Sequence, residues 1–94
     1  MKEYDFRTVS LLQVLANPIR YQILKALEHG ENTVTELALM TGREVPNISQ
    51  HLRILRQQNL VRFRTEKNQV YYQLKKGEIL SILYKVNDFV RRKL

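Results

Sequence analysis

Apolar residues recur at helical spacing along most of the chain, and residues 60–74 are the one segment with a different period. Apolar side chains three and four residues apart predict helices over 4–16 and 18–28. Asn17-Pro18 separates them, because asparagine caps a helix start well and proline is tolerated in the first helical position. His29-Gly30 is expected to end the second helix, with the glycine in a left-handed conformation.

A third helix is predicted to open at Thr33 and to end before Gly42. Thr33 and Glu36 have the spacing of a capping box, in which each side chain accepts a hydrogen bond from the other residue's backbone N–H. Gly42 supplies a turn to the next helix, so residues 33–58 have the layout of a helix-turn-helix.

The fourth helix is predicted to begin between Glu44 and Pro46 and to run to about residue 58. Ile48, Leu52 and Leu55 lie at i, i+4 and i+7 and are expected to face the core. The opposite side carries hydrogen-bonding and basic groups. A recognition helix presents such a face to the DNA major groove.

Residues 60–74 alternate with the period of β-strands and predict a hairpin. The tip is expected at Glu66-Lys67-Asn68, and Arg62 and Arg64 share the outer face of the first strand. We interpret the Tyr71-Tyr72 pair as hairpin core rather than as a surface that stacks RNA bases. The inward strand positions are expected to be Val61, Phe63, Val70, Tyr72 and Leu74.

Residues 78–94 return to helical spacing, with an apolar stripe wider than one small domain needs. This stripe and the apolar first helix predict a partner surface, although both helices could instead pack on their own domain. The predicted fold is mostly α with a small β-hairpin: a winged helix-turn-helix in the order α-α-α-α-β-β-α, formed by a single domain over 1–94. The expected dimer-interface residues are Phe6, Val9, Leu12, Ile79, Ile82, Leu83, Val86, Phe89 and Val90.

Charge is distributed unevenly along the chain. The 16 Lys and Arg against 9 Asp and Glu give a net charge of +7. Residues 1–42 carry 4 basic and 5 acidic side chains, whereas residues 43–94 carry 12 basic and 4 acidic ones. A basic half beside a near-neutral half indicates a polyanionic partner.

The chain contains no cysteine, which excludes disulfides, thiolate metal sites and thiol redox sensing within it. Its first residues, MKEYDFRTVS, lack the apolar region of a signal peptide. No run of residues approaches the ~18 apolar residues of a membrane span. We therefore expect a cytoplasmic protein without a membrane partner.

The chain resembles the ArsR/SmtB family of bacterial and archaeal winged-helix repressors. The resemblance covers about residues 12–74 and lies in three runs: LANPIRYQILKAL, TVTELA and NISQHLRILRQQNLVRFRTEKNQVYYQL. Its most specific part is Ser49-Gln50-His51-Leu52 with Leu55. The resemblance implies a homodimer that pairs its first and last helices, binds a near-palindromic operator and releases it when an inducer binds.

Asparagine and glutamine pair bidentately with adenine in the major groove, and helical geometry turns Asn47 and Gln50 outward. The resemblance adds groove or phosphate roles for Ser49 and His51, the latter at the flank of the inner face. The candidate base-reading residues are Pro46, Asn47, Ser49, Gln50 and His51. The candidate backbone contacts are Thr35, Arg43, Arg53 and Arg56, and the candidate wing contacts are Arg62, Arg64, Lys67, Asn68 and Gln69.

The sequence differs from the metal-sensing members of the ArsR/SmtB family. Thr33-Val34-Thr35-Glu36 stands where their third-helix cysteines would lie, and the last helix contains no histidine. We therefore expect no metal site and no cofactor. Two alternatives stay open: a constitutive repressor, or one controlled by an apolar effector or a partner protein at the terminal helices.

The leading hypothesis is a sequence-specific, homodimeric transcription repressor that binds double-stranded DNA. Architectural DNA binding without sequence choice is the alternative, and an interaction module that has lost DNA binding is a third class. An enzyme is not expected, because the chain offers no Cys nucleophile, no Ser-base-acid constellation and no Gly-rich phosphate loop. Ser49 and His51 are two residues apart on a helix and do not face each other.

Overall fold

The computed structural model describes residues 1–93, and the helices and hairpin follow the predicted order. The elements are α1 (Glu3–Leu15), α2 (Pro18–Ala26), a 3₁₀ turn η1 (Leu27–His29), β1 (Asn32–Thr33), α3 (Val34–Thr41), α4 (Val45–Gln57), β2 (Val61–Glu66), β3 (Gln69–Leu74) and α5 (Glu78–Lys93). The predicted fold class is confirmed. Residue 94, predicted to close the last helix, lies outside the described residues.

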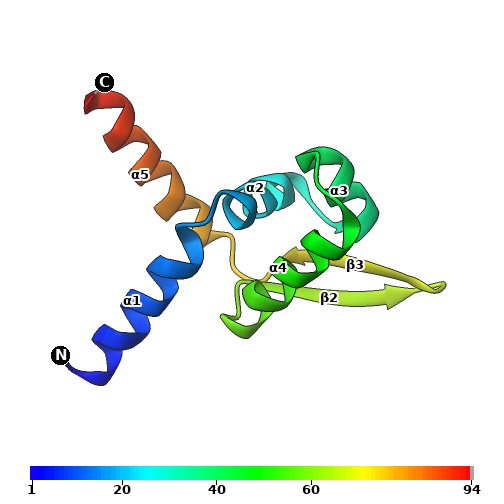
Figure 1. Cartoon of the computed structure of the whole chain (residues 1–94), viewed down its shortest axis with the longest axis horizontal. Coiled ribbons are helices and arrows are strands. Elements are labelled where there is room, and N and C mark those ends of the chain that lie inside the picture. Colours follow the sequence, from blue (N-terminus) through cyan, green and yellow to red (C-terminus); the bar gives the residue numbers. More distant parts are fainter. Residues whose placement is uncertain (94) are drawn as a thin grey trace.

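Two helices project from the rest of the molecule. In Figure 1, α1 and α5 diverge toward the two chain ends, and the β2–β3 hairpin extends in the opposite direction. The Cα radius of gyration is 14.1 Å. About 12 Å is usual for a folded chain of this length. We call α1 and α5 the arms, and α2 to α4 with the sheet the body.

Local capping explains where the helices of the body begin and end. The Asn17 side chain accepts hydrogen bonds from the backbone N–H groups of Ile19 and Arg20, which starts α2. Thr33 and Glu36 form the predicted capping box of α3. Gly42 ends α3 in the left-handed conformation, with φ 68° and ψ 27°.

The end of the second helix differs from its prediction. The α-helical part stops at Ala26, and residues 27–29 continue as a 3₁₀ turn. Gly30 has φ 136° and ψ −169°, so it is not in the left-handed helical region that we expected. This glycine instead leads the chain into the extended backbone of β1, and its φ is one that side chains rarely adopt.

A short third strand joins the hairpin. The sheet order is β1-β3-β2, and both pairings are antiparallel. In β1, Asn32 pairs with Tyr72 and Thr33 with Tyr71. Two residues are too few to show an alternating pattern, so this strand could not be predicted from the sequence. Its pairing fixes the root of the hairpin beside the start of α3.

The hairpin turns more tightly than predicted. Glu66 pairs with Gln69, so the tip is the dipeptide Lys67-Asn68 rather than three residues. Both have positive φ, 49° and 65°. Two successive residues of this kind make a type I′ turn, whose twist matches that of the flanking strands.

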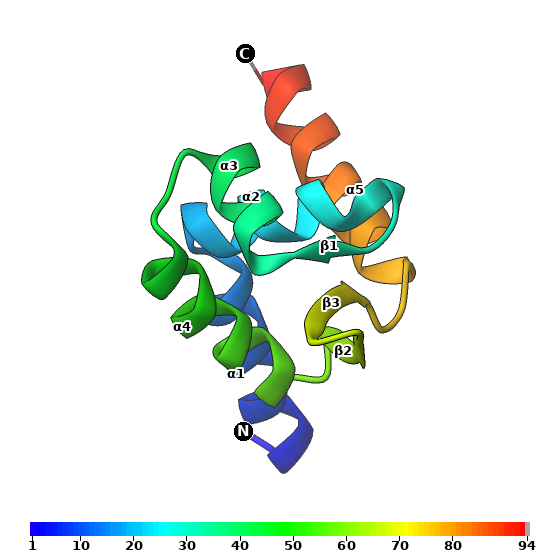
Figure 2. The same cartoon turned by 90° about the vertical axis from the view of Figure 1, so that its right-hand side faces the viewer.

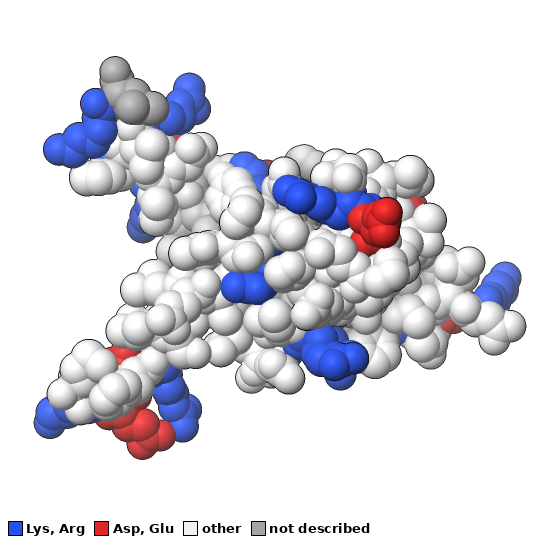
Figure 3. Space-filling model, in the orientation of Figure 1, with Lys and Arg blue, Asp and Glu red and all other residues white. Residues whose placement is uncertain are grey.

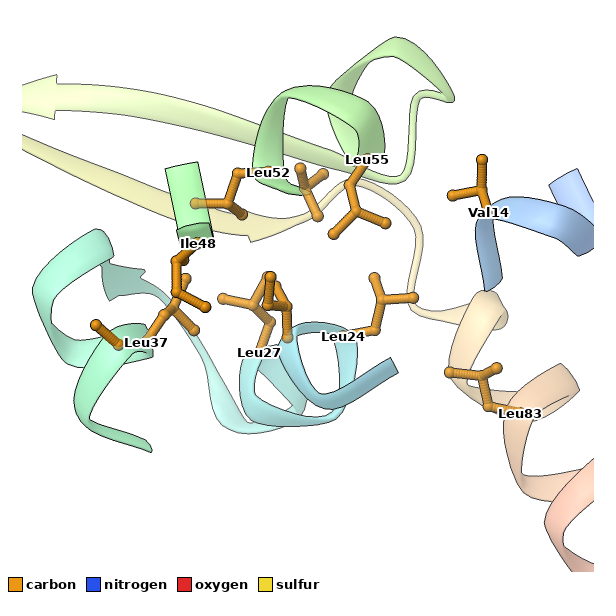
Figure 4. Packing of buried hydrophobic residues seen from close by; sticks show 11 residues of the cluster. Val14, Leu24, Leu27, Leu37, Ile48, Leu52, Leu55 and Leu83 are labelled. Carbon is orange, nitrogen blue, oxygen red and sulfur yellow. The ribbon is translucent and has the colours of Figure 1, made fainter. Parts of the chain in front are cut away.

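The hydrophobic core lies between α2, α3, α4 and the root of the sheet. Figure 4 shows the side chains of Leu24, Leu27, Leu37, Leu52 and Leu55 converging there. All three predicted inward residues of α4, the two leucines and Ile48, have 0% exposed area. The arms reach this core through Val14 of α1 and Leu83 of α5.

The inward side of the hairpin is buried only at its root. Val61 is 3% exposed, whereas Phe63 is 44% exposed, so the prediction of Phe63 as an inner residue is wrong. The hairpin runs past the body after its first residues, so the far strand positions have no layer to pack on. Phe63 contacts Tyr72 on the neighbouring strand, with the two ring centroids 5.7 Å apart.

Candidate nucleic-acid interface

Helix α4 has an inner face and two different outer surfaces. One, which we call the exposed face, consists of Pro46, Ser49, Gln50, Arg53 and Gln57. The other, which we call the half-buried flank, consists of Asn47, His51, Ile54 and Gln58. Figure 2 shows α4 along one side of the molecule, beside the hairpin that points toward the viewer.

The exposed face carries three of the predicted base-reading residues, Pro46, Ser49 and Gln50. Arg53, predicted as a phosphate contact, lies on the same face. Sequence reasoning missed Gln57, although its position seven residues after Gln50 was a sufficient signal. These side chains form a row of hydrogen-bonding groups with one cation, which matches what base edges and phosphates require.

Asn47 lies on the half-buried flank rather than facing outward. Its Oδ1 atom is buried and has no hydrogen-bond partner among the described residues. Bidentate pairing with adenine needs both the amide oxygen and the amide nitrogen. In this arrangement the amide oxygen of Asn47 is not exposed for such pairing, and its base-reading role stays a prediction.

His51 also lies on the half-buried flank, where it contacts α2. Its Nδ1 atom is 3.1 Å from Nη1 of Arg20, a residue that sequence reasoning did not single out. Burial lowers the pKa of His51, and the charges of Arg20 and Arg43 lower it further. His51 is therefore neutral at pH 7. The predicted base-reading role is not supported by this placement, because the ring is held from within the protein.

The predicted backbone contacts are all exposed. Thr35 lies in the first turn of α3, where unpaired backbone N–H groups favour a phosphate. Among residues 1–93, no carboxylate pairs with Arg43 or Arg53. The Arg56 guanidinium lies 4.7 Å from the ring centroid of Phe63, which ties the end of α4 to the hairpin.

The two arginines on the outer face of β2 differ. Arg64 donates two hydrogen bonds to the carboxylate of Glu31, at 2.8 and 3.0 Å, and lies 3.4 Å from Glu66. Its guanidinium also stacks over the ring of Tyr71, with 4.8 Å to the ring centroid. The Arg64 hydrogen bonds lower the pKa of Glu31. Arg64 is thus paired on the protein surface, with its side chain 45% exposed, and its role as a wing contact stays a prediction.

The remaining predicted wing residues stay candidates for DNA contact. Arg62, Lys67, Asn68 and Gln69 are exposed. Within the described part of the chain, no carboxylate forms an ion pair with Arg62 or Lys67. Figure 3 shows basic side chains at the tip of the hairpin, on the body and near the ends of both arms, without one continuous patch on this face.

The arms expose most of the predicted dimer surface. Phe6 is 59% exposed on α1, and Val86 and Phe89 are 56% and 55% exposed on α5. The further exposed apolar residues are Val9, Leu12, Ile82 and Val90. Ile79 and Leu83 are instead only 4% and 7% exposed, so most of their area is already covered within the chain, and their place at a dimer interface stays a prediction.

A groove of about 340 Å³ runs between the arms. Its walls include Leu12 and Leu15 of α1 and Ile82, Val86 and Val90 of α5. In residues 1–93, no three His, Asp or Glu side chains gather closely enough to hold a metal ion. Within the same residues, no helix has the length and apolar character to span a membrane.

Comparison with known proteins places this geometry in a family. Residues 17–62 match the family described as bacterial regulatory protein, arsR family. The chain is 32% identical over 89 residues to the biofilm growth-associated repressor of Xylella fastidiosa, a match covering 92% of this chain and 78% of the repressor. It is 35% identical over 75 residues to the transcriptional regulator KmtR of Mycobacterium tuberculosis, covering 80% of this chain but 58% of KmtR.

The fold is also shared with a solved structure. A homodimeric winged helix-turn-helix DNA-binding domain from Mycobacterium bovis superimposes with a TM-score of 0.83 and 25% identity. The superposition covers 100% of this chain and 94% of that domain. The exposed polar residues on α4 and the adjoining hairpin are consistent with these similarities. The chain belongs to the arsR family of bacterial regulatory proteins.

Proposed function

We propose that this chain is a sequence-specific, homodimeric transcription repressor that acts on DNA in the cytoplasm. The exposed face of α4 enters the major groove, and the β2–β3 hairpin lies on the backbone or in the minor groove. The observation that carries this proposal is the composition of α4. Its inner face, with Ile48, Leu52 and Leu55, is completely buried, while the exposed face offers polar and basic groups after its first residue, Pro46, beside a basic hairpin.

The exposed side chains suggest separate roles. Gln50 is the proposed base reader, because a glutamine amide matches the N6/N7 edge of adenine. Ser49 and Gln57 add hydrogen-bonding groups on the same face. Arg43, Arg53, Arg62 and Lys67 are proposed to contact phosphates, which position the protein without reading sequence.

The arms support a dimer. A partner that covers the exposed apolar residues of α1 and α5 would remove that surface from water, and the homodimeric Mycobacterium bovis domain has the same fold. A two-fold dimer sets its recognition helices roughly 34–36 Å apart, one turn of DNA. The proposed operator is therefore near-palindromic. Repression itself rests on the family resemblance and on the name of the Xylella fastidiosa relative.

Fluorescence anisotropy tests the proposal. The chain is titrated against a duplex taken from just upstream of its own coding region and against a scrambled duplex, each at two salt concentrations. Tighter binding to the native duplex supports a specific, self-regulating repressor, and a reporter under that promoter should then fall when the chain is expressed. Equal, salt-sensitive binding to both duplexes favours the architectural alternative.

Gln50→Ala sharpens the test. It should weaken binding to the native duplex by about 1–3 kcal/mol and leave binding to the scrambled duplex almost unchanged. Gln22→Ala is the matched control, because Gln22 is exposed on α2 and away from α4. Equal losses on both duplexes for Gln50→Ala would remove the base-reading role of this residue.

A further inference from the structure

Arg20 of α2 connects the end of α1 to α4. Its Nε atom donates a hydrogen bond to the carbonyl oxygen of Val14, at 2.7 Å. Its Nη1 atom lies 3.1 Å from Nδ1 of His51. One guanidinium therefore contacts the last turn of an arm and the half-buried flank of the recognition helix at the same time.

The partner of His51 determines which of its ring nitrogens carries the proton. An arginine side chain stays protonated and has no acceptor, so it can only donate. Nδ1 of His51 must then accept, and the ring proton resides on Nε2. Within residues 1–93, Asn47 Oδ1 is the only side-chain polar atom found both buried and unpartnered, so the proton on Nε2 of His51 is not left buried without a partner.

The charges around His51 favour this neutral form. The charged groups that face the ring are Arg20 from α2 and Arg43 from the turn before α4, and both are cations. Among the described residues, no carboxylate pairs with either arginine or with His51. A proton on Nδ1 would remove the only acceptor for Nη1 of Arg20 that this arrangement provides, and it would add a third positive charge.

A second contact ties the far end of α4 to the same arm. Nε2 of Gln58 donates to the hydroxyl oxygen of Ser10, at 3.2 Å. His51 and Gln58 are seven residues apart on the half-buried flank, so the helix is held at two points two turns apart. Both points lead to α1, one directly and one through Arg20.

We propose that Arg20 is a positioning residue that sets the orientation of the recognition helix relative to α1, with His51 as its acceptor rather than as a reader of bases. Because α1 also carries the exposed apolar surface of the arms, the contact links pairing of the arms to the direction in which the exposed face of α4 points. This inference rests on the proposed function, since it concerns how that function is achieved.

Three variants test the link at pH 7.5. Arg20→Met removes the donor, and His51→Leu removes the acceptor but leaves the contact between Arg20 and Val14. His51→Asn is the matched control, because its Oδ1 atom can take the place of Nδ1 as an acceptor. Loss of one charge-assisted hydrogen bond should weaken binding to the native duplex about tenfold for the first two variants. His51→Asn should bind within a factor of about two of the unmodified chain.

The pH dependence separates positioning from direct DNA contact. Between pH 7.5 and about 5, protonation of His51 should weaken DNA binding if the ring is an acceptor for Arg20. The same protonation should strengthen binding if the ring contacts phosphate. The profile of His51→Asn is subtracted to remove the contribution of other groups. Strengthening of binding at low pH, relative to this control, would overturn the positioning role.

Measurements on the free protein distinguish failure of the positioning role of Arg20 from failure of the proposed function. Ring ¹⁵N NMR of the free protein should show Nδ1 unprotonated, and Arg20→Met should allow a mixture of tautomers. Light scattering and thermal unfolding report whether the variants keep their assembly and fold. A chain that binds neither duplex overturns the proposed function and the positioning role with it. Normal binding by folded Arg20→Met and His51→Leu overturns the positioning role alone.

Discussion

The body and the arms of this molecule differ in how far they bury their apolar residues. In the body, Ile23, Leu24, Leu37 and the inner residues of α4 have no exposed area at all. In the arms, residues such as Phe6, Val86 and Phe89 keep more than half of theirs. The body therefore buries its apolar residues within one chain. The arms have apolar surface that a partner would have to cover. The proposed DNA contacts thus lie on the body, which buries its own apolar residues, and the proposed dimer surface lies on the arms.

The largest effect should come from the core of the body. Leu52→Ala removes a fully buried side chain beneath the exposed face and should lower the free energy of unfolding by about 2–5 kcal/mol. That is a large share of the total stability of a small domain. Chemical denaturation should show a lower midpoint with an unchanged slope. Phe89→Ala on the arm is the comparison, and an equal loss at low protein concentration would contradict the division between body and arms.

A change to the exposed apolar surface of the arms should affect assembly rather than folding. Val86→Asp places a charge in the exposed apolar surface and should convert the proposed dimer to monomers, seen by light scattering. Binding to the native duplex should then weaken about 10²–10⁴-fold, because two half-sites are no longer engaged together. Ser81→Asp adds the same charge to an exposed polar position of α5 and should leave assembly intact. A monomeric unmodified chain would contradict the proposed dimer.

The smallest effect should appear within the wing. Arg62→Ala removes a free cation and should lower the slope of log affinity against log salt by about 1. Arg64→Ala should change that slope less, because the guanidinium of Arg64 is already paired with Glu31. Anisotropy titrations over a salt series would compare the two variants. An equal change in slope would show that Arg64 exchanges Glu31 for phosphate on binding.

The fold was accessible from the sequence because local signals agreed with one another. The spacing of Ile48, Leu52 and Leu55 identified the inner face of α4, and the capping residues Asn17 and Thr33 marked where helices begin. Each of these signals operates within one or two turns of helix. The strand β1 was missed because two residues are too few to carry a pattern.

The candidate site was less accessible, because contacts between distant residues decide which polar groups are free. Helical geometry turned Asn47 outward and placed His51 at the flank of the inner face, but it gave no indication that His51 contacts Arg20 of α2. Arg62 and Arg64 look identical in the strand pattern, yet Glu31, far away in the chain, pairs with only the second. Residue type and helical period supply candidates for DNA contact, and tertiary packing then selects among them.

The two-residue turn at Lys67-Asn68 has a consequence for the thermodynamics of docking. Its flanking residues Glu66 and Gln69 are paired in the sheet, so only two residues at the hairpin tip lie outside the strand pairing. Fixing one flexible residue costs about 1–2 kcal/mol of conformational entropy. A longer, mobile loop would lose that amount several times over on binding. Here the chain loses this entropy when it folds, so the contacts proposed for Lys67 would lose little affinity to ordering of the backbone.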